Sequence, residues 1–91
     1  MTLNSLYSTI LERKNNPSPG SYTAKLLADG EDEIVKKVGE EAIEVIVAAK
    51  GQGDERIVSE VADLIYHTMV LLASRGIAWR TVEEELSRRK R

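Results

Sequence analysis

The sequence predicts an all-α protein, a helical bundle of two long antiparallel helices plus shorter helices, completed by homo-oligomerisation. Three observations predict it. Apolar residues recur three and four positions apart in several segments, and no segment alternates apolar and polar residues as a strand would. The chain has 91 residues and no cysteine, so packing alone must hold it. We expect a single domain spanning residues 1–91.

The N-terminal third predicts two short helices separated by a loop. Residues 2–14 carry an apolar face with helical spacing, formed by Leu3, Leu6, Tyr7, Ile10 and Leu11. Two prolines and a glycine in residues 17–20 end this helix. Ser21 is placed to cap a second helix that runs through Ala28, and Gly30 follows its end.

The rest of the chain predicts two long helices and a last short one. Acidic residues begin the first, from Glu31 to Lys50, and the second runs from Asp54 to Ser74 between two glycines. Thr81 and Glu84 have the spacing of a capping box, which places the start of a final helix at Thr81. That helix runs toward the basic residues 88–91, which we interpret as a solvated tail.

Both long helices are apolar over more than one face. On the helical wheel Ile43 and Val47 point away from Glu41. On the second long helix, Val58, Ile65 and Met69 lie away from the side that carries Leu64 and Leu71. A helix that is apolar nearly all round must be covered all round. We therefore expect a second copy to cover these faces, in a dimer or a dimer of dimers.

Composition excludes several classes of function. Without cysteine there is no zinc–thiolate site, iron–sulfur cluster or cysteine nucleophile. The formal net charge of -2 gives no general attraction to nucleic acid or anionic lipid. No apolar run approaches the roughly 20 residues that cross a bilayer, and residues 1–10 lack the pattern of a signal peptide. We expect a cytoplasmic protein that binds neither nucleic acid nor membranes.

Four acidic residues stand where apolar residues are expected. Glu41 and Glu44 are three residues apart on the first long helix, and Glu60 and Asp63 repeat this spacing on the second. Antiparallel helices would bring the four together, and buried like charges are tolerated when they are paired or bind a metal ion. Oxygen ligands without thiolates favour Mg²⁺, with Mn²⁺ as the alternative, and Mg²⁺ commonly takes phosphate oxygens as further ligands.

Four further residues are candidates for supporting roles. Lys37 lies one turn before Glu41 and could pair with it or bind a substrate phosphate, and Lys25 is a second phosphate candidate. Glu40 could be a plain surface acid or could contact the groups that bind the ion. His67, the only histidine, lies one turn after Asp63, and we interpret it as a residue that supports the metal ligands rather than as a general base.

Three motifs resemble those of the phosphoribosyl-ATP pyrophosphohydrolase family, and the resemblance covers essentially the whole chain. They are Ser21-Tyr22-Thr23, the Lys36-Lys37-Val38-Gly39-Glu40-Glu41-Ala42 run with Glu44, and Glu60-Val61-Ala62-Asp63-Leu64 with Tyr66-His67. The pairing of EExxE with ExxD is also similar to the wider MazG-like superfamily of all-α nucleotide pyrophosphatases.

The resemblance implies Mg²⁺-dependent hydrolysis of phosphoribosyl-ATP to phosphoribosyl-AMP and pyrophosphate, the second step of histidine biosynthesis. It implies that Glu41, Glu44, Glu60 and Asp63 hold the metal. It also implies a functional link to a separate phosphoribosyl-AMP cyclohydrolase, since this chain has no cysteine for that zinc enzyme. The chemistry needs phosphate charge neutralised and a water aligned. We expect Glu41 or Glu44 to orient this water, and Lys37 to act in catalysis on the phosphates.

Two alternative functions remain open. A general nucleoside-triphosphate pyrophosphatase of the house-cleaning type would keep the fold and change the substrate. A non-catalytic helical dimerisation module would make the acids incidental. A ferritin-like di-iron bundle is disfavoured because it requires two Glu-x-x-His motifs and the chain has one histidine.

Overall fold

The computed structural model describes residues 1–89, which form five α-helices. They are α1 (Leu3–Asn15), α2 (Tyr22–Asp29), α3 (Glu31–Ala49), α4 (Asp54–Ser74) and α5 (Trp79–Arg89). No strand occurs in this described part of the chain. The all-α prediction is confirmed, and residues 90–91 of the expected basic tail lie outside the described residues.

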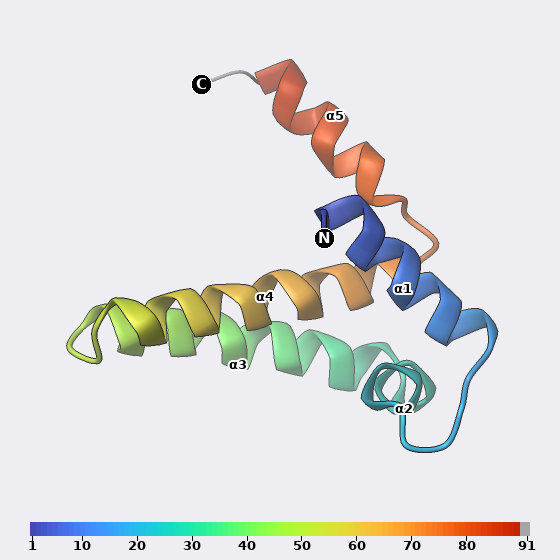
Figure 1. The fold of residues 1–91 in the computed structure, drawn as a ribbon, viewed down its shortest axis with the longest axis horizontal. Helices are drawn as coiled ribbons and strands as arrows, with labels where there is room; N and C mark the ends of the chain where they lie inside the picture. Colours follow the sequence, from blue (N-terminus) through green and yellow to red (C-terminus); the bar gives the residue numbers. More distant parts are fainter. Residues whose placement is uncertain (90–91) are drawn as a thin grey trace.

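The helices α3 and α4 form a long antiparallel hairpin that dominates the molecule (Figure 1). Helices α1 and α2 pack against the end of the hairpin that lies away from its α3–α4 connection, and α5 projects from that same end. The antiparallel arrangement of the two long helices is as predicted. It places the middle of α3 beside the middle of α4, where the four acids lie.

Local sequence signals begin and end the first helices. The Ser21 hydroxyl accepts a hydrogen bond from the Ala24 N–H, as the predicted cap requires. Thr2 and Ser5 cap α1 reciprocally. Gly30 joins α2 to α3 with a φ of 98°, a conformation that favours glycine, so the chain turns here with no intervening residue.

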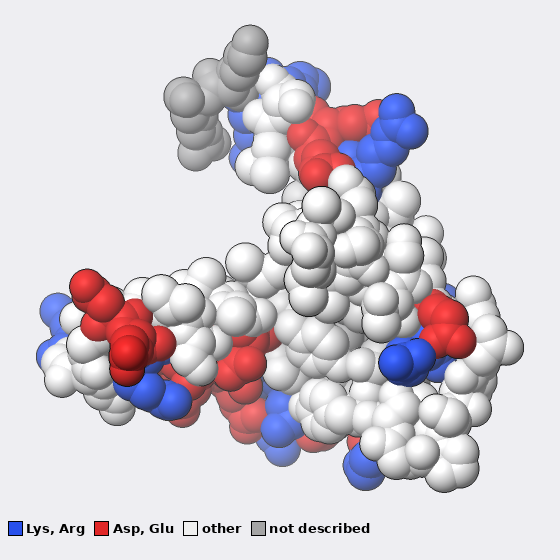
Figure 2. All heavy atoms as spheres, in the orientation of Figure 1, with Lys and Arg blue, Asp and Glu red and all other residues white. Residues whose placement is uncertain are grey.

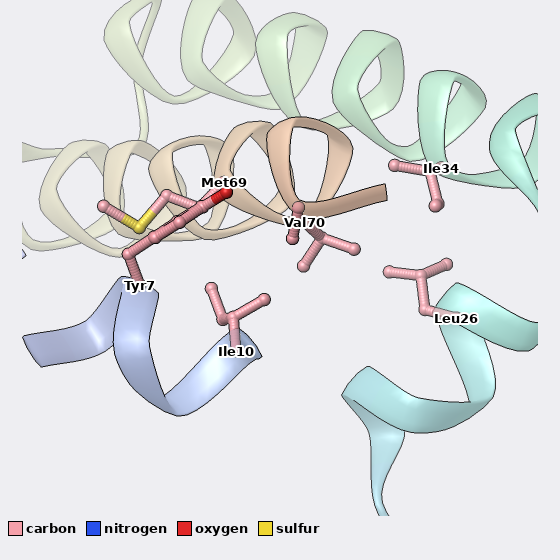
Figure 3. Close-up of a cluster of buried hydrophobic side chains, with 7 residues drawn as sticks. Tyr7, Ile10, Leu26, Ile34, Met69 and Val70 are labelled. Carbon is pink, nitrogen blue, oxygen red and sulfur yellow. The ribbon is translucent and has the colours of Figure 1, made fainter. Parts of the chain in front are cut away.

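The core lies where α1, α2 and the hairpin meet (Figure 3). Its buried residues come from four helices: Tyr7, Ile10, Leu26, Ile34, Met69, Val70 and Ala73. Met69 is fully buried next to α1, so the prediction that it faces outward to a second copy is wrong. Ile65 packs against the same cluster. Helix α1 covers this side of α4, which the helical wheel of α4 alone could not show.

Helix α5 begins at Trp79, two residues before the predicted cap at Thr81. The prediction of a capping box at Thr81 and Glu84 is wrong, because Thr81 lies within the helix and its N–H bonds to the Ala78 carbonyl. Tertiary contacts fix this start. Trp79 packs against the core cluster, and the Tyr7 hydroxyl donates a hydrogen bond to the carbonyl of Ile77. Both anchors lie N-terminal to Thr81, so they fix the start of α5 ahead of the predicted cap.

By length and composition α4 could cross a membrane, with a mean hydropathy of 1.4 over its best 18-residue window. The expectation that no segment is long and apolar enough therefore needs correction. The same test is passed by core helices of soluble proteins. In this structure α4 packs against α3 and α1, and it carries Glu60 and Asp63 at its middle.

Large apolar side chains remain exposed along the hairpin. They are Val35, Ile43, Ile46 and Val47 on α3 and Val58 and Val61 on α4. The predicted outward direction of Ile43, Val47 and Val58 is thus confirmed. A single copy of the chain leaves this apolar surface in contact with water.

Candidate metal centre

Three carboxylates from the two long helices converge at the middle of the hairpin. Carboxylate oxygens of Glu41, Glu60 and Asp63 lie within 4.8 Å of one another. Figure 2 shows acidic side chains along the hairpin and a largely uncharged surface on its side facing α5. The sequence prediction that acids of the two helices meet thus agrees with the placement of these three residues.

Helix periodicity explains why Glu41 points toward α4. Ile34 and Ala48 lie seven residues before and after Glu41, on nearly the same side of α3, and both are fully buried. Glu41 therefore occupies the stripe of α3 that packs on α4, and it is half-buried. The i,i+3 spacing of Glu60 and Asp63 puts both carboxylates on the facing surface of α4.

An open pocket of about 410 Å³ surrounds these acids. Glu40 and Glu44 line it together with Glu41, Glu60 and Asp63, and Ile43 is the one apolar residue of its lining. Glu44 is exposed and is not one of the three residues whose oxygens converge. The structure therefore separates a tight group of three acids from two acids at the rim.

Burial raises the pKa of Glu41 above its ordinary value, and the negative charge of Asp63 raises it further. A hydrogen bond from the Glu41 carboxyl to Glu60 also favours the protonated form, while His67 acts in the opposite direction. The neighbouring carboxylates thus disfavour the ionised form of Glu41. Mutual repulsion of this kind is what a bound divalent ion relieves.

Arg56 contacts the acidic group and was not found from the sequence. Its Nη2 donates a hydrogen bond of 2.7 Å to Oε1 of Glu60, whose side chain is only 7% exposed. The guanidinium neutralises the most buried carboxylate of the site. The i,i+4 spacing of Arg56 and Glu60 was the available signal, but such pairs are common on solvated helix surfaces.

The two predicted phosphate ligands lie beside other acids. Lys37 Nζ is 3.7 Å from Oε1 of Glu40, not paired with Glu41. Lys25 Nζ donates a 2.9 Å hydrogen bond to Asp29 of its own helix, which raises the pKa of Lys25. Neither lysine lines the acidic pocket. Both side chains are long and at least partly exposed, so a ligand phosphate could draw them away from these weak surface pairs.

His67 is buried one turn from Asp63 and is held from both sides. Its Nδ1 is 2.7 Å from the backbone carbonyl of Asp63, and its Nε2 is 3.1 Å from the Tyr22 hydroxyl. A carbonyl only accepts, so Nδ1 carries the proton, and in the neutral imidazole Nε2 accepts from Tyr22. Next to this contact, the Thr23 and Tyr66 hydroxyls are hydrogen-bonded. The first turn of α2 is thereby fixed to α4 beside the acids.

The donor set of the site fits a hard divalent cation. All the converging atoms are carboxylate oxygens, and neither cysteine nor a histidine nitrogen belongs to the group. A group of three carboxylates could hold Mg²⁺ or Mn²⁺ and leave further coordination positions to water and phosphate oxygens.

Comparison with known proteins identifies closely similar chains. The family model of phosphoribosyl-ATP pyrophosphohydrolase matches residues 3–90. The phosphoribosyl-ATP pyrophosphatase of Sulfurisphaera tokodaii is 58% identical over 87 residues, which is 96% of this chain and 93% of the relative. That of Lactiplantibacillus plantarum is 51% identical over 85 residues, 93% of this chain and 80% of the relative.

A longer relative contains a similar segment. The histidine biosynthesis bifunctional protein HisIE of Caldanaerobacter subterraneus is 53% identical over 87 residues, which cover 96% of this chain but 42% of that protein. A chain of this kind thus occurs both by itself and as part of a larger polypeptide.

Proposed function

The chain belongs to the phosphoribosyl-ATP pyrophosphohydrolase family, and on this premise we propose its function in full: it is a phosphoribosyl-ATP pyrophosphatase of histidine biosynthesis. It hydrolyses phosphoribosyl-ATP to phosphoribosyl-AMP and pyrophosphate. The observation that carries the proposal is the convergence of the Glu41, Glu60 and Asp63 carboxylates from two helices, since phosphoanhydride hydrolysis depends on neutralising phosphate charge.

The metal is Mg²⁺ in this proposal, with Mn²⁺ as a substitute, held by Glu41, Glu60 and Asp63 with Glu44 at the rim. When bound, the ion supplies charge neutralisation at the phosphates and lowers the pKa of water. Arg56 donates a hydrogen bond to Oε1 of Glu60. His67 and Glu40 support these ligands from outside the group.

The protein groups have separate tasks. Glu44 is an exposed acid of the pocket that does not belong to the converging three, so it is placed to accept a proton from the attacking water while those three are engaged. Lys37 leaves Glu40 and contacts a phosphate oxygen, and Lys25 contacts a second phosphate. Cleavage between the α- and β-phosphates then needs no covalent intermediate with the protein.

We also propose that the protein works as a cytoplasmic homo-oligomer, a dimer or a dimer of dimers. The exposed apolar residues of α3 and α4 support this part of the proposal, because a second copy would remove them from water. The product would pass to a phosphoribosyl-AMP cyclohydrolase. The similarity to part of a bifunctional histidine-biosynthesis protein supports such a functional link.

The test is release of pyrophosphate from phosphoribosyl-ATP, measured with Mg²⁺ and with EDTA. We expect turnover in Mg²⁺ and none in EDTA. A panel of free nucleoside triphosphates in the same assay tests the alternative of a general pyrophosphatase, and equal turnover of that panel would refute the substrate assignment.

Variants locate the site. Glu41→Ala, Glu60→Ala and Asp63→Ala should each lower turnover at least about 100-fold, since removing a group that stabilises developing charge costs this much. Glu84→Ala on α5 makes the same chemical change far from the hairpin and should keep full turnover. Wild-type activity in two of the three site variants would contradict the site.

A further inference from the structure

Tyr22 is an exposed aromatic residue that is nevertheless held in place. Its side chain belongs to the first turn of α2, and 49% of the residue surface is exposed. Its hydroxyl bonds to His67 Nε2, and its ring lies edge-on to the His67 ring with centroids 6.0 Å apart. Tyr66 covers part of it, at 6.3 Å and 30° between ring planes. The rest of the ring is open to a ligand and loses little conformational entropy when one binds.

The position of Tyr22 follows from the helix that carries its partner. Asp63 and His67 are four residues apart on α4, so they are separated by about 6 Å along the helix axis. The Tyr22 hydroxyl is 3.1 Å from His67. The aromatic ring therefore lies about one to two helical turns from the acidic group, on the side toward α2.

The surroundings of the acidic pocket favour this direction for the base of a nucleotide. The pocket lining contains five acids and Ile43, so it offers no aromatic face. Beyond Tyr22, Lys25 lies three residues further along α2, on the same side of that helix. Carboxylates, an aromatic ring and a lysine thus follow one another from the middle of α4 to α2.

We propose that Tyr22 binds the base of the substrate, with its open ring face stacking on the adenine. This inference rests on the proposed function. Phosphoribosyl-ATP carries its triphosphate on one side of the adenine and the phosphate of the added ribosyl group on the other. The order of carboxylates, tyrosine and Lys25 matches that order of metal-bound triphosphate, base and second phosphate. Stacking of a base on an aromatic side chain contributes enough to affect affinity measurably.

The experiment compares two substitutions at Tyr22 by steady-state kinetics with phosphoribosyl-ATP. Tyr22→Leu removes the ring, and we expect KM to rise about 10-fold, the effect of one stacked base, with kcat within about twofold of wild type. Tyr22→Phe keeps the ring and removes the bond to His67, and its KM should stay within about threefold. Tyr7→Phe is the matched control, since it also removes a tyrosine hydroxyl, one bonded to the Ile77 carbonyl away from α2 and the acidic pocket, and should leave KM unchanged.

A binding measurement separates this inference from the proposed function. Titration of AMP into the Mg²⁺-containing protein requires no turnover, and Tyr22→Leu should weaken AMP binding about 10-fold while inorganic pyrophosphate binds as to wild type. If the wild type turns over phosphoribosyl-ATP and Tyr22→Leu binds AMP normally, the inference is wrong and the function stands. An equal rise of KM in Tyr22→Phe, or a changed oligomeric state of Tyr22→Leu, would also overturn it, because the hydroxyl or a subunit contact would then explain the effect.

Discussion

The three converging carboxylates differ in how the protein surrounds them. Glu60 is buried and hydrogen-bonded to Arg56, Glu41 is half-buried and has a raised pKa, and Asp63 is exposed. Arg56 therefore already neutralises one acid, a second favours its protonated form, and the third is in contact with water. The folded protein can hold three acids arranged in this way without a metal ion, and binding an ion stabilises it further.

The raised pKa of Glu41 predicts how stability depends on pH in the metal-free protein. A carboxyl whose folded pKa lies above its unfolded value stabilises the fold fully below the unfolded pKa, and this stabilisation is lost as the pH rises through the folded pKa. Glu41→Gln cannot ionise and keeps that stabilisation. In EDTA at pH 7 its Tm should exceed that of wild type by a few degrees, with a difference that shrinks as the pH falls toward the ordinary pKa of a glutamate carboxyl.

Thermal unfolding followed by circular dichroism across this pH range checks the prediction. Glu84→Gln, an exposed acid of α5, serves as the control and should follow the wild-type curve. A difference between Glu41→Gln and wild type that grows toward acid pH would contradict the assigned direction of the pKa shift.

Arg56 is predicted to stabilise the metal-free site. Arg56→Ala leaves the buried Glu60 carboxylate without its hydrogen-bonded cation, a loss of about 1–3 kcal/mol in the free energy of unfolding. Added Mg²⁺ should then raise Tm more in Arg56→Ala than in wild type, because the ion takes over the neutralisation of Glu60.

The control for Arg56 is Arg80→Ala. Arg80 and Glu84 form an i,i+4 pair of the same kind at 3.6 Å, but both side chains are exposed. Its removal should cost less than about 0.5 kcal/mol. Equal losses for the two arginines, or an identical Mg²⁺ effect in Arg56→Ala and wild type, would show that Arg56 does not act on the site.

At the scale of whole helices, caps and tertiary anchors contribute differently along the chain. Helix α2 begins where its sequence says, at the residue after Ser21, because the Ser21 hydroxyl accepts from the Ala24 N–H. Helix α5 begins at Trp79 because the chain around Ile77 is tied to the core through Tyr7. In these two helices, a capping residue sets the start of the helix only where no tertiary contact has already fixed the chain N-terminal to it.

Two alanine substitutions test this difference between helices. Ser21→Ala removes a cap in use and should lower the free energy of unfolding by about 1 kcal/mol. Thr81→Ala removes the unused threonine of α5 and should change it by less than about 0.5 kcal/mol, as at other exposed positions. Chemical denaturation of both variants measures the two values. A larger loss for Thr81→Ala than for Ser21→Ala would contradict this assignment, because it would mean that Thr81 caps α5.

For the molecule as a whole, the hairpin of α3 and α4 supports the site and also carries exposed apolar side chains along part of its length. The core lies at one end of the hairpin, where α1 and α2 pack. Further along, Ile46 is 60% exposed and Val58 is 69% exposed. The apolar composition by which α4 resembles a membrane span thus also leaves apolar side chains of the hairpin in contact with water.

The proposed oligomer predicts the effect of a charge on this surface. Val58→Glu and Ile46→Glu should each shift the protein from oligomer to monomer, because a buried unpaired carboxylate strongly disfavours an apolar interface. Size-exclusion chromatography with light scattering measures the mass. Ser87→Glu adds the same charge to α5 and should leave the mass unchanged. A monomeric wild type, or both hairpin variants at wild-type mass, would contradict the proposal.

The sequence by itself determined the all-α fold, four of the helix positions within one or two residues, and the meeting of acids from α3 and α4. These depend on local periodicity and on the short connection that forces the hairpin. The tertiary structure alone decided that Met69 is covered by α1, that α5 starts at Trp79, and that Glu44 stands apart from the converging three. It also decided that Arg56 neutralises Glu60 and that Tyr22 is fixed beside His67. Periodicity gives the direction of a side chain on its own helix, whereas which neighbour it meets depends on how separate helices pack.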